Sequence, residues 1–174
     1  MKNDKGFTLV ELIVVILLLA IVSLYAASRY TGKGSVSAFA LQDQMISVIR
    51  QVQVSRMQSN VTNLYNYCSI TPSNDKQREL KALCLKSRLN LSSDCVGSSE
   101  ACGLANVDGI SSGVRGDDVS FSFLPNGLTQ VEFDLLGNPL NAASSGVTVN
   151  ISGTQSSSSL CINSQGYVSA GACL

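Results

Sequence analysis

The stretch that decides the fold is residues 7–27, FTLVELIVVILLLAIVSLYAA. Only three of its 21 residues are polar, namely Thr8, Glu11 and Ser23. An α-helix of this length extends about 31 Å, which matches the roughly 30 Å hydrocarbon core of a bilayer. The stretch therefore predicts a membrane-spanning helix. A cleaved secretory signal has a shorter apolar core of roughly 7 to 15 residues, although residues 20–22 or 26–28 could imitate its cleavage site and keep that alternative open.

The composition of the whole chain argues against several classes of enzyme. Charged residues make up 14% of the 174 residues, against about 25% in typical soluble domains. Histidine is absent, which excludes His-dependent metal sites and both Ser-His-Asp and Cys-His catalysis. The formal net charge is zero, so no overall basic field attracts nucleic acid. We therefore expect a protein that is not an enzyme and holds no cofactor.

The segment before the apolar stretch is short and basic. Residues 1–6 read MKNDKG, with Lys2 and Lys5 before the terminal Gly6, and Glu11 is the fifth residue after that glycine. A carboxylate at the centre of a bilayer costs about 2.5 to 3.5 kcal/mol on insertion scales, and less near the headgroups. Glu11 therefore either reaches the interface from the first turn of the helix or requires a partner.

Residues 5–23, KGFTLVELIVVILLLAIVS, resemble the N-terminus of type IV pilins and of type II secretion pseudopilins. The resemblance implies that a prepilin peptidase cleaves between Gly6 and Phe7 on the cytoplasmic side and methylates the new α-amine of Phe7. It also implies that Glu11 of one subunit neutralises the Phe7 amine of a neighbour as the helices assemble. Such a pair would offset the cost of burying either charge and would fix the axial register of the subunits.

Two positions depart from that family pattern. Many pilins carry Pro where this chain has Ser28 and Gly where it has Ala20, so any kink those residues give is in question here. Residues 31–35 contain Gly32 and Gly34, and each glycine in a helix costs about 1 kcal/mol relative to Ala. We expect a bend or a melted stretch there.

Residues 31–59 have the pattern of an amphipathic helix. Their apolar residues recur at helical spacing, at Leu41, Met45, Val48, Ile49 and Val52. This pattern indicates the second half of one long helix whose apolar stripe packs on a sheet. A separate soluble core helix would make the same contacts and remains an alternative.

Residues 60–174 read as a β-rich head. Residues 60–70 are a first strand or the start of a loop, residues 78–91 a short helix, and residues 92–116 an irregular loop. Alternating apolar residues predict a hairpin of residues 119–123 and 131–135 around a turn at 125–127, and a second hairpin of residues 147–151 and 160–162. The expected fold class is α+β, the pilin fold, with the long helix packed on an antiparallel sheet of four or more strands.

The C-terminal half carries a further resemblance. The stretches VEFDLLGNPLN (131–141), VTVNIS (147–152) and LCINSQGYVSAGAC (160–173) resemble minor pilins and pseudopilins of the FimT/GspH kind. Together with the N-terminal segment, the chain most resembles minor pilins of the mannose-sensitive haemagglutinin (MSHA) pilus, of the MshC type.

Six cysteines in a head outside the cytoplasm indicate three disulfides, although fifteen pairings are formally possible. Proximity in the sequence favours Cys68 with Cys84, Cys95 with Cys102, and Cys161 with Cys173. The last pair also resembles the C-terminal disulfide loop of many pilins. A zinc site is disfavoured because the cysteines form no CxxC pair and no histidine can complete the site.

Other charged residues give weaker signals. Asp108, Asp117 and Asp118 could supply oxygens to Ca²⁺, but they lack the spacing of a calcium loop and read as a solvated turn. Glu132 and Asp134 are expected on the outward face of a strand. A basic run indicates a solvated helix face or, alternatively, a patch for DNA or an acidic partner; it consists of Lys76, Arg78, Lys81, Lys86 and Arg88.

The chain thus divides into a leader peptide (1–6), a membrane and assembly helix (7–30), an amphipathic half-helix (31–59) and a disulfide-containing head (60–174). We expect a structural or assembly-initiating minor subunit of a type IV pilus, with prepilin peptidase and other pilin subunits as partners. It would be anchored once in the bacterial inner membrane with its head in the periplasm, and later lie in the pilus at the cell surface. The alternatives are a type II secretion pseudopilin and a tip-located subunit that binds a surface ligand or DNA.

Overall fold

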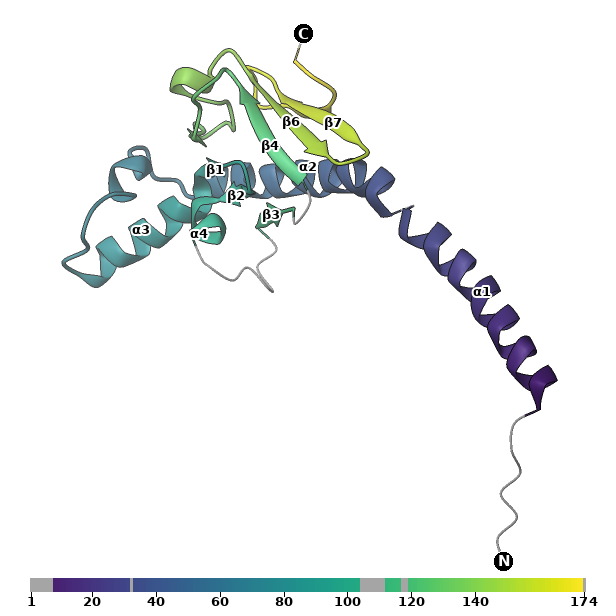
Figure 1. The fold of residues 1–174 in the computed structure, drawn as a ribbon. Helices are drawn as coiled ribbons and strands as arrows, with labels where there is room; N and C mark the ends of the chain where they lie inside the picture. Colours follow the sequence, from purple (N-terminus) through teal and green to yellow (C-terminus); the bar gives the residue numbers. More distant parts are fainter. Residues whose placement is uncertain (1–7, 32, 104–111, 117–118, 174) are drawn as a thin grey trace, which may run out of the picture.

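The computed structural model describes residues 8–31, 33–103, 112–116 and 119–173. A long apolar helix at the N-terminus extends away from a head that combines shorter helices with two antiparallel sheets (Figure 1). The fold class is α+β with a pilin-like arrangement, as the sequence predicts.

Two long helices follow each other at the N-terminus. Helix α1 (Leu9–Thr31) lies outside the head, whereas α2 (Lys33–Gln58) runs through it. Their axes point in different directions (Figure 1). The change of direction falls within the stretch where the sequence predicts a bend, although Gly32 itself lies outside the described residues.

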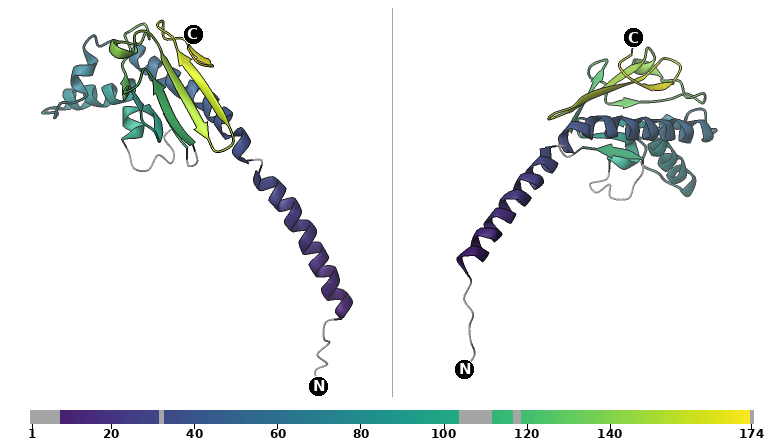
Figure 2. Two further views of the ribbon diagram at one scale, coloured as in Figure 1. Left: turned by 45° about the horizontal axis from the view of Figure 1, so that its top comes forward. Right: turned by 90° about the vertical axis from the view of Figure 1, so that its right-hand side faces the viewer.

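Helix α2 is packed between the two sheets, with one sheet on each side of it (Figure 2). Its inward residues recur every three or four positions, which is the spacing of one helix face. They are fully or almost fully buried: Ala38, Met45, Val48, Ile49 and Val52. Because both flanks of α2 are covered, a single core joins the helix to both sheets.

Two four-stranded sheets replace the single sheet that the sequence predicts. The first sheet has the order β3-β2-β1-β5, and the second has the order β4-β6-β7-β8. The strands of the first are β1 (Leu89–Leu91), β2 (Cys95–Ser98), β3 (Gly113–Arg115) and β5 (Gln130–Val131). The strands of the second are β4 (Val119–Leu124), β6 (Val147–Gly153), β7 (Ser157–Ile162) and β8 (Val168–Ala170).

One predicted hairpin is confirmed and the other is wrong. Strands β6 and β7 pair antiparallel with Val149 opposite Leu160, as expected. Strand β4 instead pairs with β6, and β5 pairs with β1 in the other sheet. The turn that follows β4 therefore carries the chain from one side of α2 to the other. Apolar residues alternate in both segments because each segment buries one face on its own side of α2. The local sequence of two such segments is the same as that of a hairpin.

Two further local predictions need correction, and an open alternative is decided. The described residues of 92–116 are not an irregular loop, because they contain β2, the short helix α4 (Ser99–Cys102) and β3. Of the two alternatives for residues 60–70, the loop is confirmed, and it contains a 3₁₀ helix, η1 (Leu64–Tyr67). The helix predicted at residues 78–91 is α3 (Asp75–Ser87), after which the chain enters β1. A second 3₁₀ helix, η2 (Asn141–Ala143), precedes β6.

The last turn of α2 carries a buried cation. The Arg56 side chain is 2% exposed, and its guanidinium donates hydrogen bonds to the carbonyls of Phe133 (2.9 Å) and Val61 (2.9 Å). It also lies 5.1 Å from the centre of the Tyr65 ring, whose hydroxyl accepts a hydrogen bond from the Phe133 N–H (2.7 Å). Burial raises the pKa of Tyr65. Arg56 thus connects α2 to the segment that follows it and to the segment that follows β5.

Two turns of the head have the same hydrogen-bond pattern. In residues 134–138 the Asp134 carboxylate accepts hydrogen bonds from the N–H groups two and four residues later (2.8 and 2.8 Å). In residues 163–167 the Asn163 side-chain oxygen accepts the equivalent pair (2.9 and 2.9 Å). Each turn also has a glycine at positive φ in its fourth position, as such turns require.

The two turns meet on α2 through a buried glutamine. The Gln53 amide donates hydrogen bonds to the carbonyls of Gly137 (3.1 Å) and Gly166 (2.7 Å), one from each turn. A Cβ atom at Gly166 would collide with the Gly137 carbonyl. The two turns, which we call the twin turns, therefore lie against each other and are fixed by one side chain of α2.

Candidate processing and assembly site

The first element of the candidate site is the surface of α1. Residues Leu9–Ala26 have a mean hydropathy of 2.8, and none of them is buried inside the molecule. By length and composition this segment can cross a membrane. Because this apolar surface is not buried inside the molecule, its burial requires lipid or another protein.

Glu11 is the only charged residue of that segment, and it lies in the first turn of α1. Its Oε2 atom accepts hydrogen bonds from the backbone N–H (3.1 Å) and the hydroxyl (3.0 Å) of Thr8. The Thr8 Oγ1 atom in turn accepts a hydrogen bond from the Glu11 N–H (3.3 Å). These reciprocal bonds form a capping box, which satisfies N–H groups that a helix start leaves without partners.

The sequence reasoning missed the capping role of Thr8. In the stretch Thr8-Leu9-Val10-Glu11, a threonine is followed three residues later by an acid. This spacing is the signature of a capping box and would have predicted it. The Glu11 carboxylate therefore has a local structural role in the isolated chain. Any role between subunits must compete with this intrachain arrangement. Gly6 and Phe7, the residues of the expected cleavage site, lie outside the described residues.

The cysteines of the head are joined in the three pairs that proximity favours. Cys68–Cys84 links the segment after η1 to α3, with a Cα–Cα distance of 5.4 Å. Cys95–Cys102 links β2 to the end of α4, at 5.8 Å. Cys161–Cys173 links β7 to the C-terminal segment, at 4.9 Å, where the Cys173 N–H also donates to the Thr148 hydroxyl (3.0 Å). All six cysteines are used, so none is available as a metal ligand or nucleophile.

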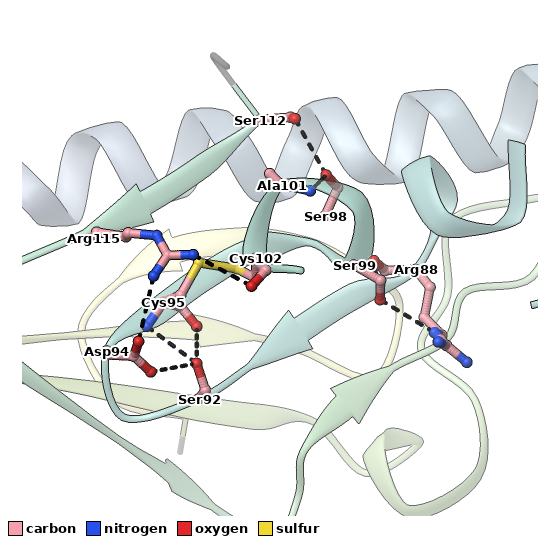
Figure 3. The surroundings of a disulfide bond; sticks show 10 residues. All are labelled: Arg88, Ser92, Asp94, Cys95, Ser98, Ser99, Ala101, Cys102, Ser112 and Arg115. Carbon is pink, nitrogen blue, oxygen red and sulfur yellow. Dashed lines mark hydrogen bonds and ion pairs between the residues drawn. A yellow bond between two sulfur atoms is a disulfide. The ribbon is translucent and has the colours of Figure 1, made fainter. Parts of the chain in front are cut away.

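The Cys95–Cys102 disulfide joins β2 to α4 within the segment that the sequence predicts to be a loop (Figure 3). The Ser92 hydroxyl accepts a hydrogen bond from the Cys95 N–H (3.1 Å), which closes the turn before β2. The Arg115 guanidinium donates to the Asp94 carboxylate (3.4 Å) and to the Cys102 carbonyl (3.3 Å) from β3. Each of β2 and β3 also buries one valine, Val96 or Val114, but so short a strand shows no alternation of apolar and polar residues in the sequence.

The basic run of α3 is mostly engaged in local contacts. Arg78 forms an ion pair with Asp75 (3.1 Å), Lys81 donates to the Ile70 carbonyl (2.8 Å), and Arg88 donates to the Ser99 hydroxyl (3.2 Å). Only Lys76 and Lys86 are left exposed without such a contact among the described residues. This arrangement favours the solvated helix face over a dedicated patch for nucleic acid.

The acidic residues also differ from the prediction. Glu132 and Asp134 follow the end of β5 and do not lie on a strand. Asp134 is a turn-forming residue, and the Glu132 Oε2 atom accepts a hydrogen bond from the Asn141 side-chain amide (3.1 Å). The described part of the chain contains no group of three or more metal-ligating side chains. Asp108, Asp117 and Asp118 lie outside it.

The comparisons with known proteins agree with the geometry of the N-terminal segment. Residues 1–27 match the Prokaryotic N-terminal methylation motif. This match identifies a prepilin-type signal of the kind carried by type IV pilins and related proteins, and such a signal directs processing and assembly rather than catalysis. The search of curated proteins finds no match for the chain. The search of solved structures finds none either.

Proposed function

We propose that the chain is a structural or assembly-initiating minor subunit of a type IV pilus, of the MSHA type. The observation that carries the proposal is the methylation motif at residues 1–27, together with an apolar helical segment, Leu9–Ala26, of which no residue is buried inside the molecule. The resemblance of the C-terminal half to minor pilins supports the MSHA type. In this proposal residues 1–6 are the leader, 7–30 the membrane and assembly helix, 31–59 its amphipathic continuation and 60–174 the head.

Processing and assembly then follow from the chemistry of the N-terminus. Prepilin peptidase cleaves between Gly6 and Phe7 and methylates the amine of Phe7, which leaves a cation at the start of an apolar helix. While the subunit is in the inner membrane with its head in the periplasm, the Glu11 carboxylate lies near the cytoplasmic headgroups. When helices associate in a filament, both charges leave water, and pairing the Phe7 amine of one subunit with Glu11 of another offsets much of that cost. The subunit then lies in the pilus at the cell surface.

The test separates the two roles of Glu11. Glu11→Gln keeps a side chain that can close the capping box but removes the charge, so we expect normal leader removal and strongly reduced incorporation into pili. Thr8→Ala removes the cap, at a cost of roughly 0.5 to 2 kcal/mol of local stability, but keeps the charge, so we expect incorporation to persist. Sheared pili are assayed for the subunit by immunoblotting, alongside its processed fraction in membranes. Normal incorporation of Glu11→Gln would refute the proposed pairing.

The methylation motif itself is shared with pseudopilins of type II secretion, which is the second candidate function. The two differ in phenotype, because deletion of a pseudopilin subunit blocks export of secreted enzymes and leaves surface fibres intact. We expect deletion of this chain to reduce surface pili without a defect in export.

A further inference from the structure

We propose that Asn126 is a site of spontaneous deamidation, selected by the structure of the turn between β4 and β5. Pro125, Asn126 and Gly127 are all exposed in this turn, and residues 126–127 are the only Asn-Gly pair in the sequence. The reacting group is the asparagine amide itself, and the co-reactant is water. This inference does not depend on the proposed pilus function, because it involves neither α1 nor the methylation motif.

The reaction joins two groups that are adjacent in the chain. The Gly127 backbone nitrogen loses its proton to solvent and attacks the side-chain carbonyl carbon of Asn126, and the side-chain nitrogen leaves as ammonia. The product is a cyclic imide. Water then adds to one of the two imide carbonyls and opens the ring to aspartate or to isoaspartate, whose backbone runs through the side-chain carbonyl carbon. One amide and one water thus give one carboxylic acid and one ammonia, without oxidation or reduction.

Both reacting groups are free in the structure. Among the described residues, no hydrogen bond involves the Asn126 side chain or the Gly127 N–H. Gly127 has φ +81°, and nothing lies within 4 Å of the position that a Cβ atom would occupy there. Glycine also permits the backbone rotation that the attack requires. Neither a hydrogen bond nor a neighbouring side chain therefore hinders the approach of the nitrogen to Asn126.

Two other asparagines in turns of the head lack this freedom. The Asn163 Oδ1 atom accepts hydrogen bonds from the N–H groups of Gln165 (2.9 Å) and Tyr167 (2.9 Å), which fix the side chain within its twin turn. Asn138 is followed by Pro139, whose nitrogen has no proton to lose. Hydrogen bonding and sequence together therefore direct the reaction to Asn126.

The reaction changes the charge of a neutral part of the head. Residues 119–131 contain no Asp, Glu, Lys or Arg, so either product places the first charge of this stretch at an exposed turn. Because the ammonia escapes into solvent, the reaction does not reverse. The negative charge therefore accumulates with the age of the subunit.

The test is incubation of the full chain in detergent micelles, in mildly alkaline buffer made with heavy-oxygen water. Digestion in ordinary water follows, with tandem mass spectrometry of the peptide that contains residues 119–131. The heavy oxygen distinguishes deamidation of the folded chain from deamidation during digestion. Isoaspartate identifies the imide route, because direct hydrolysis gives only aspartate.

We expect Asn126 to react at least about tenfold faster than Asn163, equivalent to about 1.4 kcal/mol in activation free energy. Isoaspartate should be among the products. An Asn126 that stays intact, or that reacts no faster than Asn163, would overturn the proposal.

A matched variant separates the effect of structure from that of sequence. Ser164→Gly creates a second Asn-Gly pair at Asn163, whose side chain keeps its two hydrogen bonds, so this pair should react several-fold more slowly than Asn126. In urea, where the turns are unfolded, the two pairs should react at the same rate. Asn126→Gln lengthens the side chain and should abolish the reaction at this position. Near-ultraviolet circular dichroism verifies folding, and a folded Ser164→Gly variant in which Asn163 reacts as fast as Asn126 would refute selection by the turn.

Discussion

Helices α1 and α2 are adjacent in the chain and similar in length, yet they have opposite environments. None of the residues Leu9–Ala26 in α1 is buried, whereas Met45 and Ile49 in α2 are fully buried between two sheets. The more apolar of the two helices is thus the exposed one. A helix that is apolar on all sides requires surroundings that are apolar on all sides, which this head does not provide.

The difference shows which part of the molecule folds on itself and which part depends on other molecules. Helix α2 belongs to the core of the head, and its polar side chains Gln53 and Arg56 are buried because each fixes backbone carbonyls of the head. The segment Leu9–Ala26 of α1 contributes no side chain to that core. Its apolar residues therefore suit contact with lipid and with neighbouring subunits, which is what a prepilin-type signal implies.

The largest expected effect is a difference in stability between two isoleucine-to-alanine substitutions, one in each helix. Ile49→Ala leaves a cavity in the core and should lower the free energy of unfolding by about 2 to 5 kcal/mol. Ile16→Ala in α1 should change it by less than about 0.5 kcal/mol. The measurement is urea unfolding of the full chain in detergent micelles, followed by near-ultraviolet circular dichroism. Equal effects of the two substitutions would show that α1 packs on the head.

A smaller difference in stability is expected between two glutamine substitutions on opposite faces of α2. Gln53→Ala leaves the carbonyls of Gly137 and Gly166 without their donor, so we expect a loss of about 1 to 3 kcal/mol. The matched control Gln51→Ala, on the exposed face of the same helix, should have almost no effect. The same unfolding assay applies. A Gln53→Ala variant as stable as the control would show that the twin turns hold together without α2.

The smallest expected effect concerns the action of acid on one turn of the head. Burial opposes ionisation of Asp134, but N–H donors from Asn138 and Leu136 outweigh it and hold the pKa of Asp134 below its usual value. Because the folded-state pKa is lowered, the stabilisation is complete above the unfolded pKa of about 3.9 and is lost as the pH falls through the folded-state value. Asp134→Asn should therefore cost less than about 1 kcal/mol at pH 7, since solvent screens this exposed carboxylate.

The other twin turn supplies the control for that prediction. Asn163→Asp places a second carboxylate in the same hydrogen-bond pattern, so the loss of stability below about pH 4 should become larger. Asp134→Asn removes the first carboxylate, so that loss should become smaller. The measurement is the urea midpoint between pH 3 and pH 7. Parallel pH profiles for both variants and the unaltered chain would contradict this account of the turns.

Some elements were predictable from the sequence because their signals are local. The apolar stretch at residues 7–27 predicts α1, and the spacing of Met45, Ile49 and Val52 predicts the buried face of α2. The β6/β7 hairpin follows from alternation on both sides of a short turn. Processing at Gly6 and Phe7 and the assembly role of Glu11 stay predictions from the motif.

Other elements could not be predicted because their cause lies far away in the sequence. Strand β4 pairs with β6 rather than with the nearer β5, since α2 separates the two sheets. Strands β2 and β3 have four and three residues, and each buries one valine, Val96 or Val114, which is too short a pattern to show alternation. The positive φ of Asn141 (+55°) is a further feature that no residue type alone dictates.

The most direct test of the central claim is the mass of the N-terminal peptide from purified pili that contain this chain. Arginine-specific proteolysis after Arg29 releases the N-terminal fragment for tandem mass spectrometry and leaves Lys2 and Lys5 of an unprocessed chain uncut. We expect a fragment that begins at Phe7 and carries one additional methyl group on its α-amine. A fragment that begins at Met1, or one cleaved near residues 20–28, would contradict the proposal that the chain is a processed pilus subunit.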